Sequence, residues 1–430
     1  MDTRRDNVSK AARLDSTCRF PHNTLLVLCV ALLLNSTLRG IRTPGGWAAT
    51  SLLINYDFGF SRRGLLGAII SWLHTPALYT YTFNFWFAIV IFTANVSLLL
   101  TLLNRVYRVG SLDSKFTALV FTSSFAIVFL AHCIGYSEQV PLLFTLVILQ
   151  INHFYWRAVL VLTLFPACLL IHETALPMLF PVIFFRFLPD LAGSLDRKRV
   201  CIVGALAIIM PVLGLTIGAY HLSKPVALAM YQSLQSKADF PLRTDQFVWL
   251  MRSSRDSLHW SFNIYPDAFV QNLLVYSLTV TLPSALYLLL RAVRLLRARA
   301  YHPITYWIAT GAGLSPVFLD IIGAGDTARY NSMAITSSFL IFATTVLYFR
   351  QDIAQGGDEV RLNWLPPAML VLLNLGSTIQ FFDYYEVQNF PYQGHIDDLT
   401  KTVLGREPFP PRPDTWWYDP ASVINDYNGD

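Results

Sequence analysis

Short polar motifs in this sequence carry residue types suited to acid–base chemistry or anion binding. The first, Asn55–Gly64, places Asp57 five and six residues ahead of Arg62 and Arg63. Guanidinium groups bind phosphate through paired hydrogen bonds, and a carboxylate can act as a general base. The simpler interpretation is that Asp57 pairs with one arginine and anchors a neighbouring short helix.

A second motif, His172–Glu173, follows an apolar segment directly. A histidine beside a carboxylate can form an acid–base unit or hold a polar ligand group. The alternative is an interfacial pair that caps a helical turn. The motif lacks the second histidine of HExxH, which excludes a zinc metalloprotease of that class.

A third motif, Gly323–Tyr330, places Asp326 and Arg329 within one helical turn, where they could also simply pair with each other. No strand precedes its glycines, so a dinucleotide-binding loop is excluded. The second aspartate motif of an intramembrane aspartyl protease is also missing. Glu138, in a short connection beginning at Gly135, is a further candidate.

The composition determines which elements can position these residues. Of 430 residues, 54% are hydrophobic and 14% charged, whereas soluble domains carry about 25% charged residues. Five cysteines without paired spacing indicate neither a disulfide framework nor a zinc site. The sequence therefore predicts an all-α, polytopic integral membrane protein.

A membrane-spanning helix needs about 20 mostly apolar residues, and about eleven segments approach this pattern. The predicted spans are 23–39, 82–103, 116–135, 140–156, 158–172, 175–190, 200–221, 269–290, 303–323, 332–349 and 363–380. The apolar run Gly64–Leu73 is too short to span and predicts an interfacial or re-entrant helix after the first span.

Charge asymmetry predicts the orientation of these spans. Residues 1–22 form a basic tail without a cleavage site, and Lys and Arg recur in alternate short connections. We therefore expect a cytoplasmic N-terminus and an extracytoplasmic C-terminus. The transmembrane domain is 23–380 with outer loops 40–81 and 223–268, followed by an extracytoplasmic tail, 381–430, rich in proline and aromatic residues.

In this topology the candidate residues all reach the outer face by independent routes along the chain. They are Asp57, Arg62, Arg63, Glu138, His172, Glu173, Asp326 and Arg329. The cytoplasmic connections are short and basic and contain no glycine-rich nucleotide loop. Their charge reflects topology rather than nucleic-acid binding, so we expect chemistry at the outer face.

The first motif with its neighbouring short helix, together with the His–Glu and Asp-x-x-Arg motifs, resembles the GT-C superfamily of membrane glycosyltransferases. It is also similar to O-antigen-polymerase-like and EpsG-like families of bacterial surface-polysaccharide synthesis. The resemblance implies a bacterial inner-membrane location, a polyprenyl-phosphate-linked sugar donor, a glycan or glycolipid acceptor and contact with membrane lipids. The paired acidic signature of several GT-C families is absent from 55–64, which leaves Asp57 as the sole base.

The resemblance also implies a role for each candidate residue. Asp57 is the catalytic base, and donor phosphate binds Arg62, Arg63 and Arg329. Substrate-binding or orienting roles fall to Glu138, His172, Glu173 and Asp326. No cofactor is required, and a divalent metal ion is compatible with this chemistry but not demanded by it, since arginines can stabilise the leaving phosphate.

Two other functions fit the same sequence. One is a transporter or flippase for a lipid-linked or anionic solute, because prolines interrupt several predicted spans. These are Pro166, Pro177, Pro211, Pro283 and Pro316. Transporters often carry internal repeats, and the sequence shows none. The other is a non-catalytic membrane subunit of a polysaccharide assembly complex.

Overall fold

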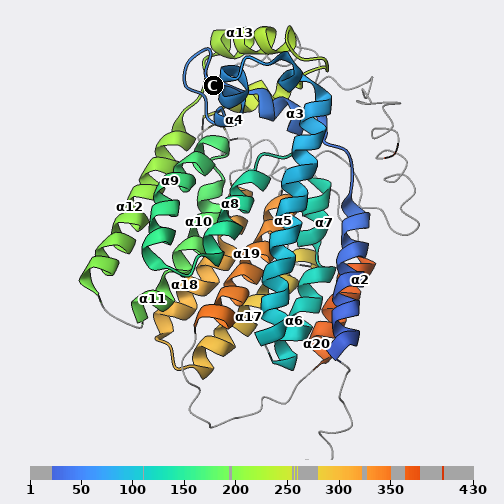
Figure 1. Ribbon diagram of the computed structural model, residues 1–430, viewed down its shortest axis with the longest axis vertical. Helices are drawn as coiled ribbons and strands as arrows, with labels where there is room; N and C mark the ends of the chain where they lie inside the picture. The colour runs from blue at the N-terminus through green and yellow to red at the C-terminus, as the bar shows by residue number, and fades with distance from the viewer. Residues whose placement is uncertain are drawn as a thin grey trace, which may run out of the picture.

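The computed structural model describes residues 22–109, 111–192, 196–253, 256, 259, 279–321, 327–349, 364–377 and 400. Within these residues the regular elements are helices (Figure 1). The predicted all-α fold is therefore confirmed. Most of the N-terminal and C-terminal tails, part of loop 223–268, and Asp326 lie outside the described residues.

The longer helices form a bundle (Figure 1). Its elements are α2 (His22–Gly40), α5 (Tyr81–Val109), α6 (Leu112–Ser123), α7 (Phe125–His132), α8 (Gln139–Gln150), α9 (Phe154–Ile171), α10 (Ala175–Phe185), α11 (Leu188–Ala192), α12 (Arg197–Ala219), α17 (Leu282–Ala298), α18 (Pro303–Leu314), η4 (Ser315–Ile321), α19 (Thr327–Tyr348) and α20 (Leu365–Gly376).

Seven helices in the described part of the chain are long and apolar enough to cross a membrane. They are α5, α6 with α7, α9, α10 with α11, α12, α17 with residues 279–281 before it, and α19. The other four predicted spans fall on α2, α8, α18 and α20, which are helical but are not among these seven. The α-helix α18 gives way to a 3-10 helix at Ser315–Pro316, where proline supplies no N–H. Eleven spans, and the orientation of the chain, thus remain predictions.

Helix α19 lies at the centre of the bundle and packs against α7, α10, α17 and α18. Its buried residues include many small hydroxyl-bearing side chains, namely Ser332, Thr336, Ser337, Ser338, Thr344 and Thr345. Small residues let helix backbones approach closely, which favours packing where lipid surrounds the bundle. The Ser337 hydroxyl, for example, donates to the carbonyl of Met178 on α10 at 3.0 Å.

A group of short helices, here called the cap, covers one end of the bundle (Figure 1). The cap consists of α3 (Gly46–Leu53), α4 (Leu65–Trp72), η1 (Pro76–Tyr79), α13 (Lys224–Gln235) and α14 (Thr244–Met251). It has its own hydrophobic core, in which Leu52 and Ile70 join Met230 and Phe247. The two segments predicted as outer loops therefore fold together.

Helix α4 confirms a helix within Gly64–Leu73, but α3, α13 and α14 were not predicted. Each of these three is too short to show a long apolar repeat, and its apolar side chains are buried only because the other segments of the cap cover them. On α4, Trp72 is 76% exposed and Ile69 47%. An exposed apolar face suits contact with lipid, and the interfacial or re-entrant placement of α4 stays a prediction.

Replacing Gly67 with alanine should destabilise the cap. A Cβ atom at Gly67 would lie 2.1 Å from the carbonyl oxygen of Ile54 and 2.5 Å from that of Leu53, both backbone atoms. We expect a loss of about 1–3 kcal/mol in unfolding free energy, the usual range for overpacking. Thermal unfolding of the purified protein in detergent would measure it. Gly45→Ala is the matched control, because nothing lies within 4 Å of its Cβ position; equal melting temperatures for the two variants would contradict this packing.

Candidate functional site

Five of the predicted site residues meet beneath the cap, in what we call the buried polar cluster. It consists of Arg63, Glu138, His172, Glu173 and Arg329. They come from four places: the loop before α4, the turn before α8, the connection between α9 and α10, and the first turn of α19. None of these side chains is more than 14% exposed. The structure thus brings together residues up to 266 positions apart in the sequence.

Arg63 and Glu173 form a bidentate ion pair at the outer edge of this cluster. The Arg63 Nε lies 2.9 and 3.1 Å from the two Glu173 carboxylate oxygens, and Nη2 lies 2.5 Å from Oε1. Burial alone would raise the pKa of Glu173, but the Arg63 charge and hydrogen bonds, with further positive charge from Arg62, together outweigh burial and hold that pKa well below its usual range. Arg63 adopts a positive φ of 68°, which is unusual for a side chain of this size.

His172 lies between the two carboxylates. Its Nδ1 accepts hydrogen bonds from the Thr174 hydroxyl at 2.6 Å and the Thr174 N–H at 3.3 Å. The remaining proton is therefore on Nε2, which faces Glu138 Oε1 at 3.7 Å. Burial and the nearby Arg63 charge lower the pKa of His172 to about 3. His172 is consequently neutral at physiological pH.

Glu138 and Arg329 form the inner ion pair of the cluster. Both Glu138 carboxylate oxygens are buried and, apart from ion pairing, accept no hydrogen bond from the described residues. The Arg329 guanidinium also lies 5.5 Å from the ring centroids of Tyr136 and Tyr330. A carboxylate buried with few donors is a candidate for binding or proton transfer.

Acidification should destabilise the protein through His172. Its pKa is about 6.5 in the unfolded chain and about 3 in the folded protein, so the unfolded state binds more protons between these values. The unfolding free energy should fall as pH drops below 6.5, by up to about 1.4 kcal/mol per pH unit. Glu173, whose folded pKa is depressed, adds to this loss only below its ordinary pKa of 4.5.

The window between pH 6.5 and 4.5 therefore separates the effect of His172 from that of Glu173, and thermal unfolding across it gives the measurement. His172→Gln should flatten the pH dependence in this window. His221→Gln, which changes an exposed histidine, should leave the wild-type slope. An unchanged slope in His172→Gln would show that another group controls the acid sensitivity.

Arg62 lies beside the cluster but binds backbone. Its Nη1 donates to the carbonyl of Gly218 at 3.2 Å, and its Nη2 donates to those of Trp249 and Arg252. These bonds join the end of α12 to the end of α14. Arg62 also contributes positive charge to the surroundings of His172 and Glu173. Counting Arg62, the described residues here hold three guanidinium groups and two carboxylates, an excess of positive charge that favours an anion.

Asp57 belongs to a separate and accessible network on the cap. Its carboxylate accepts from the Ser71 hydroxyl at 2.9 and 3.0 Å and from Asn55 Nδ2 at 3.1 Å, and it lies 3.8 Å from Lys237 Nζ. The Asp57 side chain is 39% exposed. The structure therefore places the predicted base among cap residues rather than among the paired charges of the cluster.

Two features near the site were not predicted. Thr174 fixes the tautomer of His172. Because Thr174 directly follows His172–Glu173, its place in the sequence could have indicated this role. Phe60 stacks on Tyr56 at 5.7 Å between ring centroids and meets Tyr220 edge-on at 4.9 Å. No spacing in the sequence connects Phe60 with Tyr220, because only the tertiary fold brings α12 to this loop.

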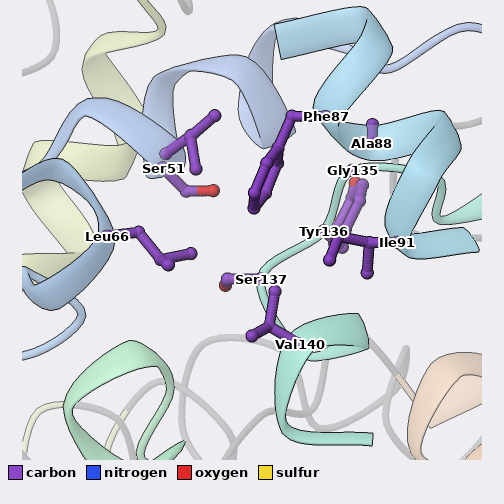
Figure 2. A pocket seen from close by; sticks show the side chains of 10 residues that line it. Ser51, Leu66, Phe87, Ala88, Ile91, Gly135, Tyr136, Ser137 and Val140 are labelled. Atoms are coloured by element: carbon purple, nitrogen blue, oxygen red, sulfur yellow. The ribbon is translucent and has the colours of Figure 1, made fainter. Parts of the chain in front are cut away.

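A small hollow opens between the cap and α5, close to the cluster (Figure 2). Ser51, Leu66, Phe87, Tyr136 and Val140 are among its lining residues. Its volume of about 10 Å³, room for about one water molecule, is far below the roughly 300–1,000 Å³ of ligand pockets. Tyr136 lines the hollow and its ring also contacts Arg329, so the hollow adjoins the cluster.

Groups of three metal-binding side chains are not found in the part of the chain that the structure describes. Comparison with models of protein families, with curated proteins and with solved structures gives no significant match. Fold and site together define an α-helical protein with several membrane-spanning helices and a buried ionisable cluster beneath a helical cap.

Proposed function

We propose that this protein is an integral membrane glycosyltransferase, or polysaccharide polymerase, that uses a polyprenyl-phosphate-linked sugar. The observation that supports the proposal most is the buried polar cluster itself. Charged side chains are unfavourable inside a membrane protein and usually mark binding or catalysis. Here four charged side chains and the neutral His172, from four distant segments, converge at one end of the bundle, next to a loop rich in aromatic residues.

The chemistry of such a transfer matches the charges present. The acceptor oxygen attacks the anomeric carbon, the bond from that carbon to the phosphate oxygen breaks, and the lipid phosphate leaves with the bonding electrons. Arg63 at the cluster's edge binds this phosphate in competition with Glu173, and Arg329 supplies positive charge deeper inside. Asp57 takes the proton of the acceptor hydroxyl, while His172, Glu138 and Asp326 bind or orient sugar hydroxyls.

Transport of a lipid-linked or anionic solute is the second candidate. In the structure the cluster's charges pair with one another, and the adjacent hollow is small. Paired charges in a closed interior suit a protein that must open to bind its ligand and close again. His172, neutral between two carboxylates, also suits a proton relay.

A reconstituted assay separates the two functions. Full-length protein in proteoliposomes would receive a radiolabelled polyprenyl-phosphate sugar and a glycan or glycolipid acceptor. Glycosyl transfer predicts a new labelled glycosidic product, and a folded Arg63→Met/Glu173→Leu variant should not form it. Movement of the labelled lipid between leaflets without any new glycosidic bond would overturn the proposal in favour of transport.

A further inference from the structure

A groove unrelated to the buried polar cluster lies between the beginning of α2 and the end of α5. Its volume is about 390 Å³. Its lining residues are Leu26, Cys29, Val30, Leu100, Thr101, Leu103, Asn104 and Tyr107. Several α2 side chains here face outward, with Leu26 38% and Val30 44% exposed. We propose that this groove binds an anionic phospholipid.

Along the groove, the side chains of α5 change from apolar to polar to cationic, which is the order that would match the acyl chain, ester region and phosphate of a phospholipid. Leu100 and Leu103 give an apolar wall, followed by the exposed amide of Asn104, and Arg108 lies exposed in the last turn of the helix. From Leu100 to Arg108 the helix rises about 12 Å. An acyl chain fits along the leucines, the ester region at Asn104, and the phosphate at the cationic end.

Two cations stand directly beside residues that line the groove. Arg108 Nε donates to Asn104 Oδ1 at 3.1 Å, and Lys115 Nζ lies 5.2 Å from the centre of the Tyr107 ring. Arg108 comes from α5 and Lys115 from the first turn of α6, so both reach the same end of the groove. Cations at a helix end attract anionic headgroups, which gives a preference for phosphatidylglycerol over a zwitterionic lipid.

A second transmembrane helix is the competing occupant of this face. The exposed hydroxyl of Thr101, however, donates to the carbonyl of Ser97 in its own helix at 2.8 Å. It is therefore satisfied without a partner helix. The charged mouth of the groove also favours a headgroup over an apolar helix surface, because a buried guanidinium would need a counter-charge.

Native mass spectrometry of the full-length protein tests the proposal, with phosphatidylglycerol and phosphatidylcholine of identical acyl chains as probes. We expect the wild type to bind phosphatidylglycerol at least tenfold more tightly. Arg108→Gln/Lys115→Gln should abolish this preference. Lys198→Gln/Arg294→Gln removes two exposed cations elsewhere and should keep it. Val30→Trp, which fills the groove and leaves both cations in place, should weaken binding of both lipids.

Several results would overturn the proposal. Equal affinity for the two lipids would show that no anionic site exists. If Lys198→Gln/Arg294→Gln weakened the preference as much as Arg108→Gln/Lys115→Gln, the preference would reflect only the overall charge of the protein. Disulfide crosslinking of a Thr101→Cys variant into dimers, with no lipid bound, would assign the groove to a second copy of the chain. None of these results depends on whether the protein transfers sugars.

Discussion

Replacing Glu173 alone with glutamine is expected to lower the unfolding free energy by about 3–5 kcal/mol, the usual effect of breaking a buried ion pair. Arg63 donates to both oxygens of the Glu173 carboxylate, and the two side chains are only 13% and 14% exposed. Without the carboxylate, the Arg63 guanidinium remains buried with its charge uncompensated. Thermal or denaturant unfolding in detergent would measure the loss.

The double replacement Arg63→Met/Glu173→Leu provides the comparison. Apolar residues of similar volume remove both charges together, so stability should return to near the wild-type value or exceed it. Asp57→Asn is a surface control, because Asp57 and its partner Lys237 are 39% and 41% exposed and such pairs contribute about 0–1 kcal/mol. If Glu173→Gln were as stable as wild type, Arg63 would have to be hydrated or paired differently from the arrangement described.

The second large effect is expected from Asp57→Asn on glycosyl transfer. Loss of a general base usually lowers the rate by about 10²–10⁴-fold, and the asparagine keeps the size and the hydrogen bond with Ser71. We expect normal folding, normal donor binding and a loss of product in the proteoliposome assay. The measurement is the initial rate of product formation at saturating donor.

Asp239→Asn is the matched control, since Asp239 is another exposed carboxylate of the cap, which accepts from the Tyr81 N–H at 2.8 Å. It should retain transfer. Full activity of Asp57→Asn would remove Asp57 from the mechanism and direct attention to Glu138, the buried carboxylate beside His172. Equal loss in both variants would indicate that the cap needs its charges for folding rather than for catalysis.

The sequence alone determined the helical, membrane-embedded character of this protein and where its apolar segments lie. Both follow from composition and from runs of apolar residues, which depend only on neighbours along the chain. It also predicted that eight ionisable residues would share one face; of these, Asp57 lies in the cap, Arg62 binds backbone beside the cluster, and Asp326 lies outside the described residues, which leaves Arg63, Glu138, His172, Glu173 and Arg329. The structure places these five together.

The tertiary structure decided what the sequence could not. Arg62 and Arg63 are adjacent and chemically identical, yet Arg62 binds the carbonyls at the ends of α12 and α14 while Arg63 pairs with Glu173. Asp57, six residues away, faces Ser71 and Lys237 instead. The cap likewise forms only when α3 and α4 meet α13 and α14. The reason is physical. Most of these partners, such as Glu173 for Arg63 and α13 and α14 for α3 and α4, come from segments more than a hundred residues distant, and local sequence carries no record of those contacts.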